Sequence, residues 1–222
     1  MHTQAVEDYL KAIYDLQSKQ PKVATTALAD HLGVAPASVT GMVKKLAEMN
    51  LVKHEPYQGV VLTDSGRMIA LEVLRHHRLV ELYLHQAMGV PWDQVHDEAE
   101  RWEHVISEEI EDRIDELLGH PTHDPHGSPI PTRDGEVPET SNLRMSEFPS
   151  GSRVIISHVP DTDAALLRHL GDHGLYPGTE VAIVSIEAGE GSLTLRVGQT
   201  ECTLRREMAD VIAVALVEEG TP

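Results

Sequence analysis

The ten residues HDEAERWEHV, His96 to Val105, place two histidines and four carboxylates around one tryptophan. If this segment is one α-helix, four of these side chains occupy positions i, i+4, i+7 and i+8 on one face: His96, Glu100, Glu103 and His104. A face of imidazole and carboxylate groups has the chemistry to bind one metal ion. The same residues also fit an acidic, solvent-exposed helix with a core tryptophan, so other parts of the chain must decide between the two interpretations.

Further residues of the same types occur in two other segments that are expected to be helical. RHHRLVE contributes His77 and Glu81, and the N-terminal segment contributes Glu7 and Asp8. Manganese and ferrous ions bind where oxygen ligands and some imidazole converge from different elements. Three classes of function remain: a metal-dependent regulator, a metallohydrolase with an open coordination position, and a redox or metal-storage protein. The sequence has no cleft motif and only one cysteine, Cys202, which favours the regulator.

Charge divides the chain into two parts. The formal net charge is −18, yet residues 1–67 hold seven basic and seven acidic side chains, whereas the remainder holds 11 and 29. All six lysines lie within the first 53 residues. The N-terminal part therefore has no net negative charge that would repel the phosphate backbone of DNA.

The N-terminal part has the pattern of a winged helix-turn-helix. Apolar spacing predicts a helix at about 5–19, then a short helix, a turn at Gly33, and a second helix at about 36–49. Strand, turn and strand follow, with Tyr57 and Gln58 at the wing tip. Small residues at the front of the second helix are expected to approach base edges, and nearby lysines to contact phosphates. These residues are Ala35, Pro36, Ala37, Ser38, Thr40, Lys44, Lys45 and Lys53.

The remaining chain predicts an α+β multidomain protein. Amphipathic helices at about 63–88 and 92–118 are typical of a dimerisation domain, and alternating strands after a Pro/Gly-rich linker predict a small SH3-like β-barrel. The expected domains are 1–67, 68–120, the linker 121–150, and 151–222. The single cysteine, the absence of a long apolar run and the polar N-terminus lead us to expect a cytoplasmic protein with no membrane partner. A two-fold symmetric reader of two half-sites would be a homodimer on double-stranded operator DNA.

Several motifs together resemble the diphtheria toxin repressor family of metal-dependent transcriptional repressors, and its manganese transport regulator branch most closely. They are VEDYLKAIYDL, LTDSGR, RHHRLVE, VHDEAERWEHV, DPHGSPIP and the C-terminal LGDHGLYPGTEV. The last is similar to the SH3-like module of small ferrous-transport proteins. The resemblance implies a regulatory metal site and no catalysis.

The resemblance also implies which residues bind metal. A first site would use Asp8, Glu100, Glu103 and His104. A second would use His77, Glu81 and His96 with Asp161 or Asp163, and some manganese-type members would instead suggest Asp124 and His126.

Iron-type members carry cysteine and methionine at the positions of Glu100 and Asp8. The two hard carboxylates here favour Mn²⁺ as the cofactor, with Fe²⁺ as the alternative. Lys11 departs from the smaller manganese regulators, which have glutamate there, so their two-metal cluster is not expected. Without metal, Asp8 would repel Glu100 and Glu103, and bound Mn²⁺ would fasten the first helix to the dimer body.

Overall fold

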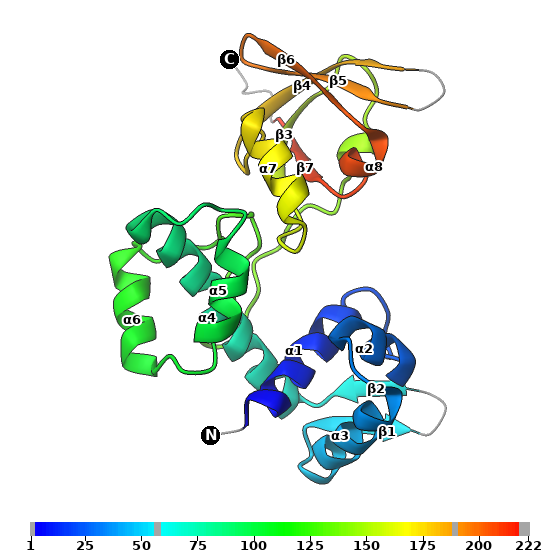
Figure 1. The fold of residues 1–222 in the computed structure, drawn as a ribbon, viewed down its shortest axis with the longest axis vertical. Helices are drawn as coiled ribbons and strands as arrows, with labels where there is room; N and C mark the ends of the chain where they lie inside the picture. The colour runs from blue at the N-terminus through cyan, green and yellow to red at the C-terminus, as the bar shows by residue number, and fades with distance from the viewer. Residues whose placement is uncertain (1–2, 56–58, 188–190, 218–222) are drawn as a thin grey trace. The chain divides into compact units, whose positions relative to one another are not determined.

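The computed structural model describes residues 3–55, 59–187 and 191–217, so the predicted wing tip at Tyr57 and Gln58 lies outside the described residues (Figure 1). The chain divides into two compact units. Unit 1 comprises 1–77, 101–108 and 131–136, and unit 2 comprises 78–100, 109–130 and 137–222.

Unit 1 contains the predicted winged helix-turn-helix. Its elements are α1 (Gln4–Gln17), α2 (Thr25–Leu32), α3 (Pro36–Glu48), β1 (Val52–Glu55) and β2 (Gly59–Leu62). Gly33 ends α2 in the left-handed conformation (φ 64°), which glycine adopts without steric cost, and Pro36 opens α3. The buried apolar faces of the three helices and the wing form one core, which includes Leu10, Ile13, Leu28, Val43 and Val60.

The helix α4 (Asp64–Met88) runs from unit 1 into unit 2. At its start, the hydroxyl of Thr63 accepts a hydrogen bond from the Gly66 N–H at 3.1 Å and donates one to the Asn50 carbonyl at 2.8 Å. A side chain at Gly66 would meet the Leu51 carbonyl oxygen, with 2.0 Å between Cβ and oxygen. The LTDSGR motif therefore joins the wing to α4 by close packing.

The helix expected over 92–118 is two helices, so that prediction is wrong. α5 (Val95–Trp102) ends before Glu103, and α6 (Glu108–Leu117) begins after a turn. Two β-branched residues, Val105 and Ile106, and the capping residue type Ser107 precede α6, and all three favour a break. Glu103 and His104 are consequently in a turn and do not continue the helical face of His96.

The C-terminal part of unit 2 is an open antiparallel sheet with short helices, and not the closed barrel that the sequence suggested. Its strands β3 (Arg153–His158), β4 (Glu180–Ile186), β5 (Leu193–Val197), β6 (Thr200–Leu204) and β7 (Ala213–Leu216) are ordered β6-β5-β4-β3-β7. In the described residues β6 and β7 are the two edges, so the strands do not close. The helices are η1 (Met145–Glu147), α7 (Ala164–Asp172) and α8 (Arg206–Ala209).

Apolar side chains of α7 pack into the core of this sheet. Leu166, Leu167 and Leu170 join Val154, Ile183 and other strand residues, and Trp92 from the segment before α5 enters the same core. The mixed α+β fold class is confirmed. Among the described helices, none has the length and apolar character needed to cross a membrane.

Candidate metal centre

The first cluster of metal-ligand side chains lies within unit 1. One ligand atom each of Asp8, Glu103 and His104 lies within 4.8 Å of the others. Asp8 projects from α1, whereas Glu103 and His104 occupy the turn that follows α5. His104 Nε2 lies 2.8 Å from Asp8 Oδ1 and 3.2 Å from Glu103 Oε1. The cluster therefore joins the first helix of the DNA-binding fold to a segment about a hundred residues later in the sequence.

Three more side chains surround this cluster. Glu7 Oε2 lies 2.7 Å from His104 Nδ1, and Lys11 Nζ donates to both oxygens of Glu103 at 2.8 and 2.7 Å. His77 Nδ1 is 2.5 Å from Glu103 Oε2. Glu7 was only a candidate for the helix face and Lys11 only a departure from a family pattern, so the sequence did not predict these contacts.

The charges in the first cluster shift two pKa values in opposite directions. Burial alone would raise the pKa of Glu103, but hydrogen bonding to His104 and His77 and the charge of Lys11 hold it well below its usual range. Burial alone would lower the pKa of His104, yet the carboxylates of Asp8, Glu103 and Glu7 outweigh it and raise the pKa to about 10. Without metal, therefore, the cluster is an ion-paired network with two positive groups, Lys11 and His104. The simple carboxylate repulsion expected from the sequence is largely compensated.

A second cluster lies within unit 2 and is fully buried. Glu81 from α4 and Asp124 and His126 from the segment after α6 bring ligand atoms within 4.8 Å of one another. His126 Nε2 donates to the Trp92 carbonyl at 2.8 Å, which turns Nδ1 toward Glu81 Oε2 at 3.7 Å. Asp124 Oδ1 accepts the backbone N–H groups of His126 and Ser128 at 2.8 and 2.9 Å.

The second cluster contains buried polar atoms whose charge or hydrogen-bonding capacity is not satisfied by the described neighbouring groups. Burial and the charge of Glu81 raise the pKa of Asp124, and Arg78 Nε remains 3.8 Å from Asp124 Oδ2. Within the described chain, Asp124 Oδ2 and His126 Nδ1 are buried without a hydrogen-bond partner. Buried polar atoms are normally satisfied, so these two are available to a cation.

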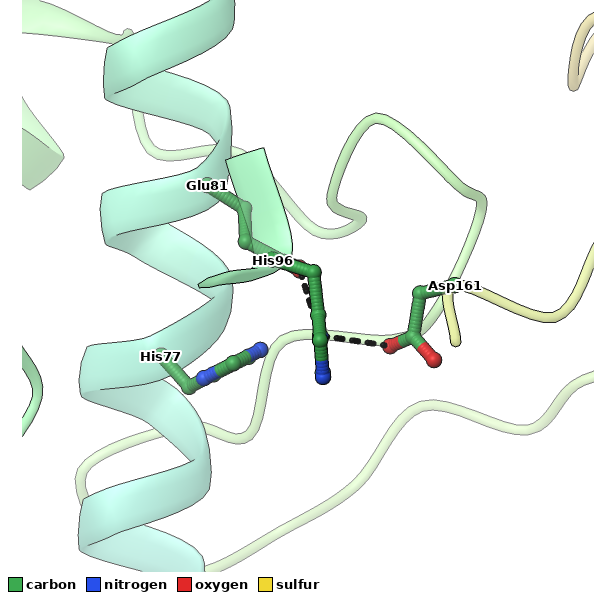
Figure 2. A group of neighbouring side chains, drawn as sticks. All are labelled: His77, Glu81, His96 and Asp161. Atoms are coloured by element: carbon green, nitrogen blue, oxygen red, sulfur yellow. Dashed lines mark hydrogen bonds and ion pairs between the residues drawn. The ribbon is translucent and has the colours of Figure 1, made fainter. Parts of the chain in front are cut away.

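His96 lies beside Glu81 in unit 2. Figure 2 shows His96 Nδ1 between Glu81 Oε1 at 3.3 Å and Asp161 Oδ2 at 3.8 Å, with His77 one helical turn from Glu81 on α4. The alternative residue Asp163 caps α7 instead. Its carboxylate accepts hydrogen bonds from the backbone N–H groups of Ala165 and Leu166, both at 3.0 Å. Of the two aspartates, the geometry places Asp161 beside the other candidate ligands.

Glu100 is a predicted ligand of the first site that belongs to a different unit from Asp8. It belongs to unit 2, where its Oε1 lies 3.9 Å from His96 Nε2 and its side chain is 43% exposed. Its place in the first site therefore stays a prediction. Because α5 ends at Trp102, Glu103 and His104 lie outside the helix that carries His96 and Glu100.

The candidate DNA contacts form an exposed surface on unit 1. Val39, Val43 and Leu46 of α3 are buried, and the eight predicted contact residues are all exposed. They are Ala35, Pro36, Ala37, Ser38, Thr40, Lys44, Lys45 and Lys53. The Thr40 hydroxyl donates to the Pro36 carbonyl at 3.0 Å, so it presents an acceptor outward.

Both clusters suit a metal ion, because they contain carboxylate and imidazole ligands and because some of these ligand atoms are buried without a hydrogen-bond partner in the part of the chain that is described. The first offers carboxylate oxygens and His104 Nε2, an atom that has no hydrogen-bond partner of proper geometry among the described residues. The second offers two carboxylates and His126 Nδ1. Imidazole with carboxylate is the ligand set of Mn²⁺ and Fe²⁺, and the absence of thiolate disfavours softer metals.

Comparison with known proteins places this chain in the class of metal-dependent, DNA-binding transcriptional repressors. Residues 1–60 match the iron dependent repressor N-terminal DNA binding domain, residues 63–132 its metal binding and dimerisation domain, and residues 143–216 the FeoA domain. The iron-dependent repressor IdeR of Mycobacterium leprae is 34% identical over 95% of this chain and 96% of its own length. The diphtheria toxin repressor of Corynebacterium diphtheriae is 29% identical over 94% of this chain and 95% of its own.

Solved structures agree with this class. A manganese-dependent transcriptional repressor in complex with manganese has a TM-score of 0.86 and 35% identity, covering 96% of this chain and 100% of its own. The manganese regulator SloR has a TM-score of 0.75 and 29% identity, covering 96% and 98%. The chain belongs to the diphtheria toxin repressor family of iron-dependent repressors, as its motifs predicted, and it is a transcriptional repressor and not an enzyme.

Proposed function

We propose that this protein is a Mn²⁺-activated repressor of metal-uptake genes, with Fe²⁺ activation as the second candidate. The observation that carries the proposal is the cluster of Asp8, Glu103 and His104, which joins α1 to the turn after α5 through oxygen and imidazole groups alone. Cys202, the one cysteine of the sequence, is in β6, in the core of the C-terminal sheet. A site without thiolate loses the ligand that favours Fe²⁺, Co²⁺ or Zn²⁺ over Mn²⁺.

The similar proteins include both iron-dependent and manganese-dependent repressors, so they support both candidate metals. IdeR is described as iron-dependent, whereas the similar solved structures include manganese-dependent repressors. Sequence identity is similar in both sets, so the ligand chemistry decides our choice of Mn²⁺. The second cluster, with Glu81, Asp124 and His126, has the same hard character. We therefore propose the same metal for both, with His77, His96, Asp161 and Glu100 as further candidate ligands.

Charge in the first cluster suggests how metal controls the repressor. Three carboxylates, Glu7, Asp8 and Glu103, face the two positive groups of Lys11 and His104, so the metal-free cluster has a net charge of one negative unit. A bound divalent ion supplies two positive charges in place of the one proton on His104 Nε2. The network that already links α1 to the turn after α5 then becomes neutral and stronger, because attraction within a partly buried cluster is weakly screened.

This link bears on DNA binding because α1 packs against α2 and α3 in one core. We propose a cytoplasmic homodimer in which residues 1–67 read operator DNA, residues 68–120 form the dimer, residues 121–150 are the linker, and residues 151–222 form the SH3-like module. Fixing α1 reduces the freedom that each reading domain would otherwise lose on binding two half-sites. By linkage, DNA must then tighten metal binding by the same factor.

The test is gel retardation of a promoter fragment at rising free Mn²⁺, comparing the wild type with Asp8→Ala and with Glu72→Ala, an exposed carboxylate of α4. We expect metal-dependent retardation in the wild type and the Glu72 control, and its loss in Asp8→Ala. Equal Mn²⁺ dependence in all three would contradict the site. Retardation without any metal dependence would contradict the function.

A further inference from the structure

Glu7 makes one of the long-range polar contacts in unit 1. Its Oε2 lies 2.7 Å from His104 Nδ1, although 97 residues separate the two in the sequence. The His104 side chain is 5% exposed and that of Glu7 is 16% exposed, so water competes little for this contact. Glu7 stands outside the group of Asp8, Glu103 and His104 whose ligand atoms converge.

The two nitrogens of the His104 ring therefore face two consecutive residues of α1. Nδ1 faces Glu7, and Nε2 faces Asp8 at 2.8 Å. A histidine can bind a metal only through a nitrogen that carries no proton. A carboxylate that accepts the N–H of one ring nitrogen leaves the other for the metal, fixes the ring orientation and increases its basicity.

We propose that Glu7 is a positioning residue of the first metal cluster, which holds the proton of His104 on Nδ1 and presents Nε2 to the ion. This inference rests on the proposed function, since it concerns the same cluster. Glu7 acts through His104 and does not bind the ion itself. Because α1 supplies both Glu7 and Asp8, a change in the helix position would disturb the ligand and its orienting partner together.

The geometry also predicts how specific the effect is. Removing Glu7 leaves the carboxylates of Asp8 and Glu103 in place and keeps the hydrogen bonds from Lys11 to Glu103, since these bonds do not involve Glu7. The His104 ring then loses its fixed orientation, and Nδ1 becomes able to compete with Nε2. Losses of such orienting partners typically weaken metal affinity by about 10- to 100-fold.

The experiment uses the full chain labelled with ¹⁵N and ¹³C histidine, in wild type, Glu7→Ala, Glu7→Gln and the control Glu72→Ala. Signals of His104 are assigned by their loss in His104→Gln. In metal-free protein the Nδ1–H signal reports the hydrogen bond to Glu7. A Mn²⁺ titration is followed by the paramagnetic broadening of the carbon-bound ring protons of His104. Because Mn²⁺ broadens signals well beyond its own ligands, each titration is repeated with Asp124→Asn added, and the midpoint that persists there is assigned to this cluster.

We expect Glu7→Ala to lose the slowly exchanging Nδ1–H signal and to shift the Mn²⁺ midpoint upward by about 10- to 100-fold. Glu7→Gln should show a smaller shift, because its amide oxygen still accepts a hydrogen bond from the Nδ1–H of His104, and Glu72→Ala should match the wild type. If Glu7→Ala fails to fold, as judged by circular dichroism, Glu7→Gln carries the test.

A midpoint within twofold of the wild type in the folded Glu7 variants would overturn the inference and leave the proposed metal site standing. If Mn²⁺ leaves the His104 signals of the wild type unbroadened, the proposed site itself is wrong, and the role of Glu7 is overturned with it.

Discussion

Replacing Glu103 by alanine should destabilise the protein much more than replacing Asp8, although both are proposed to bind the same ion. The Glu103 side chain is fully buried and accepts two hydrogen bonds from Lys11, whose side chain is only 14% exposed, and it also contacts His77. Asp8 is 36% exposed, and its Oδ1 lies 2.8 Å from His104 Nε2. The alanine at 103 therefore removes the carboxylate that accepts two hydrogen bonds from a mostly buried ammonium group, whereas the alanine at 8 removes one partly exposed ion pair.

These contacts set the expected magnitudes. Breaking a buried ion pair by removing one partner costs about 3 to 5 kcal/mol, and an exposed ion pair contributes about 0 to 1 kcal/mol. For a chain of this size, each kcal/mol lowers the melting temperature by about 2 to 4 °C. Glu103→Ala should thus melt at least about 6 °C below the wild type without metal, and Asp8→Ala at most about 4 °C below it.

Differential scanning calorimetry in the presence of a chelator measures both shifts without metal. The double variant Lys11→Met with Glu103→Ala is the matched control, since it also removes the positive charge that faced Glu103 and should recover part of the loss. A melting temperature of Glu103→Ala equal to that of Asp8→Ala would refute the argument that Lys11 and Glu103 form a buried pair that supports the fold.

Further predictions concern DNA, metal choice, pH and the C-terminal module. Lys44→Ala or Lys45→Ala should weaken DNA binding alike for all sequences and reduce the slope of log affinity against log salt by about one, and unchanged slopes in both would place the phosphate contacts elsewhere. Glu100→Cys should raise the potency of Co²⁺ relative to Mn²⁺ in anaerobic DNA binding if Glu100 is a ligand, and an unchanged ratio excludes it from the activating site. Because the pKa of His104 is raised to about 10, metal must displace its proton, so Mn²⁺ affinity should rise by up to about tenfold per pH unit from pH 7 to 9, and flat affinity would contradict this. Without metal the sign is opposite for stability: the contribution of the His104 ion pairs is full below its ordinary pKa of about 6.5 and is lost as pH rises toward 10, which pH-dependent melting would show. Asp163→Ala should destabilise unit 2 by about 0.5 to 2 kcal/mol through loss of the α7 cap and leave Mn²⁺ binding unchanged, and a shift in Mn²⁺ binding would make Asp163 a ligand.

Local patterns predicted much of the fold because they act over short distances. The period of apolar residues placed α1, α3 and α4 to within a few residues, and the turn at Gly33 followed from the need for a left-handed residue after α2. The break between Trp102 and Glu108 was missed because periodicity alone continues across it, although Ser107 before two glutamates is a helix-start signal. The sequence predicted a closed barrel where the sheet is open, because strand patterns do not determine how edges pair.

The sequence predicted the residue types of the candidate site and part of their grouping. Asp8, Glu103 and His104 converge as expected, but the contacts of Glu7 and Lys11 join residues more than ninety positions apart, and no local signal encodes them. The choice between Asp161 and Asp163 likewise depends on which carboxylate caps α7, and the sequence offers both.

The measurement that tests the central claim most directly is the affinity of the chain for DNA at buffered free Mn²⁺ and free Fe²⁺ under anaerobic conditions. The DNA is a fragment that the Mn²⁺-loaded chain selects from a random pool, and the wild type is compared with Asp8→Ala. We predict that Mn²⁺ tightens binding of the wild type by a factor in the range of about 5 to 150, that Asp8→Ala loses this gain, and that Fe²⁺ requires a higher free concentration. Tightening by Fe²⁺ at a lower free concentration than Mn²⁺ would contradict the manganese assignment, and tightening by Mn²⁺ that survives Asp8→Ala would contradict the site.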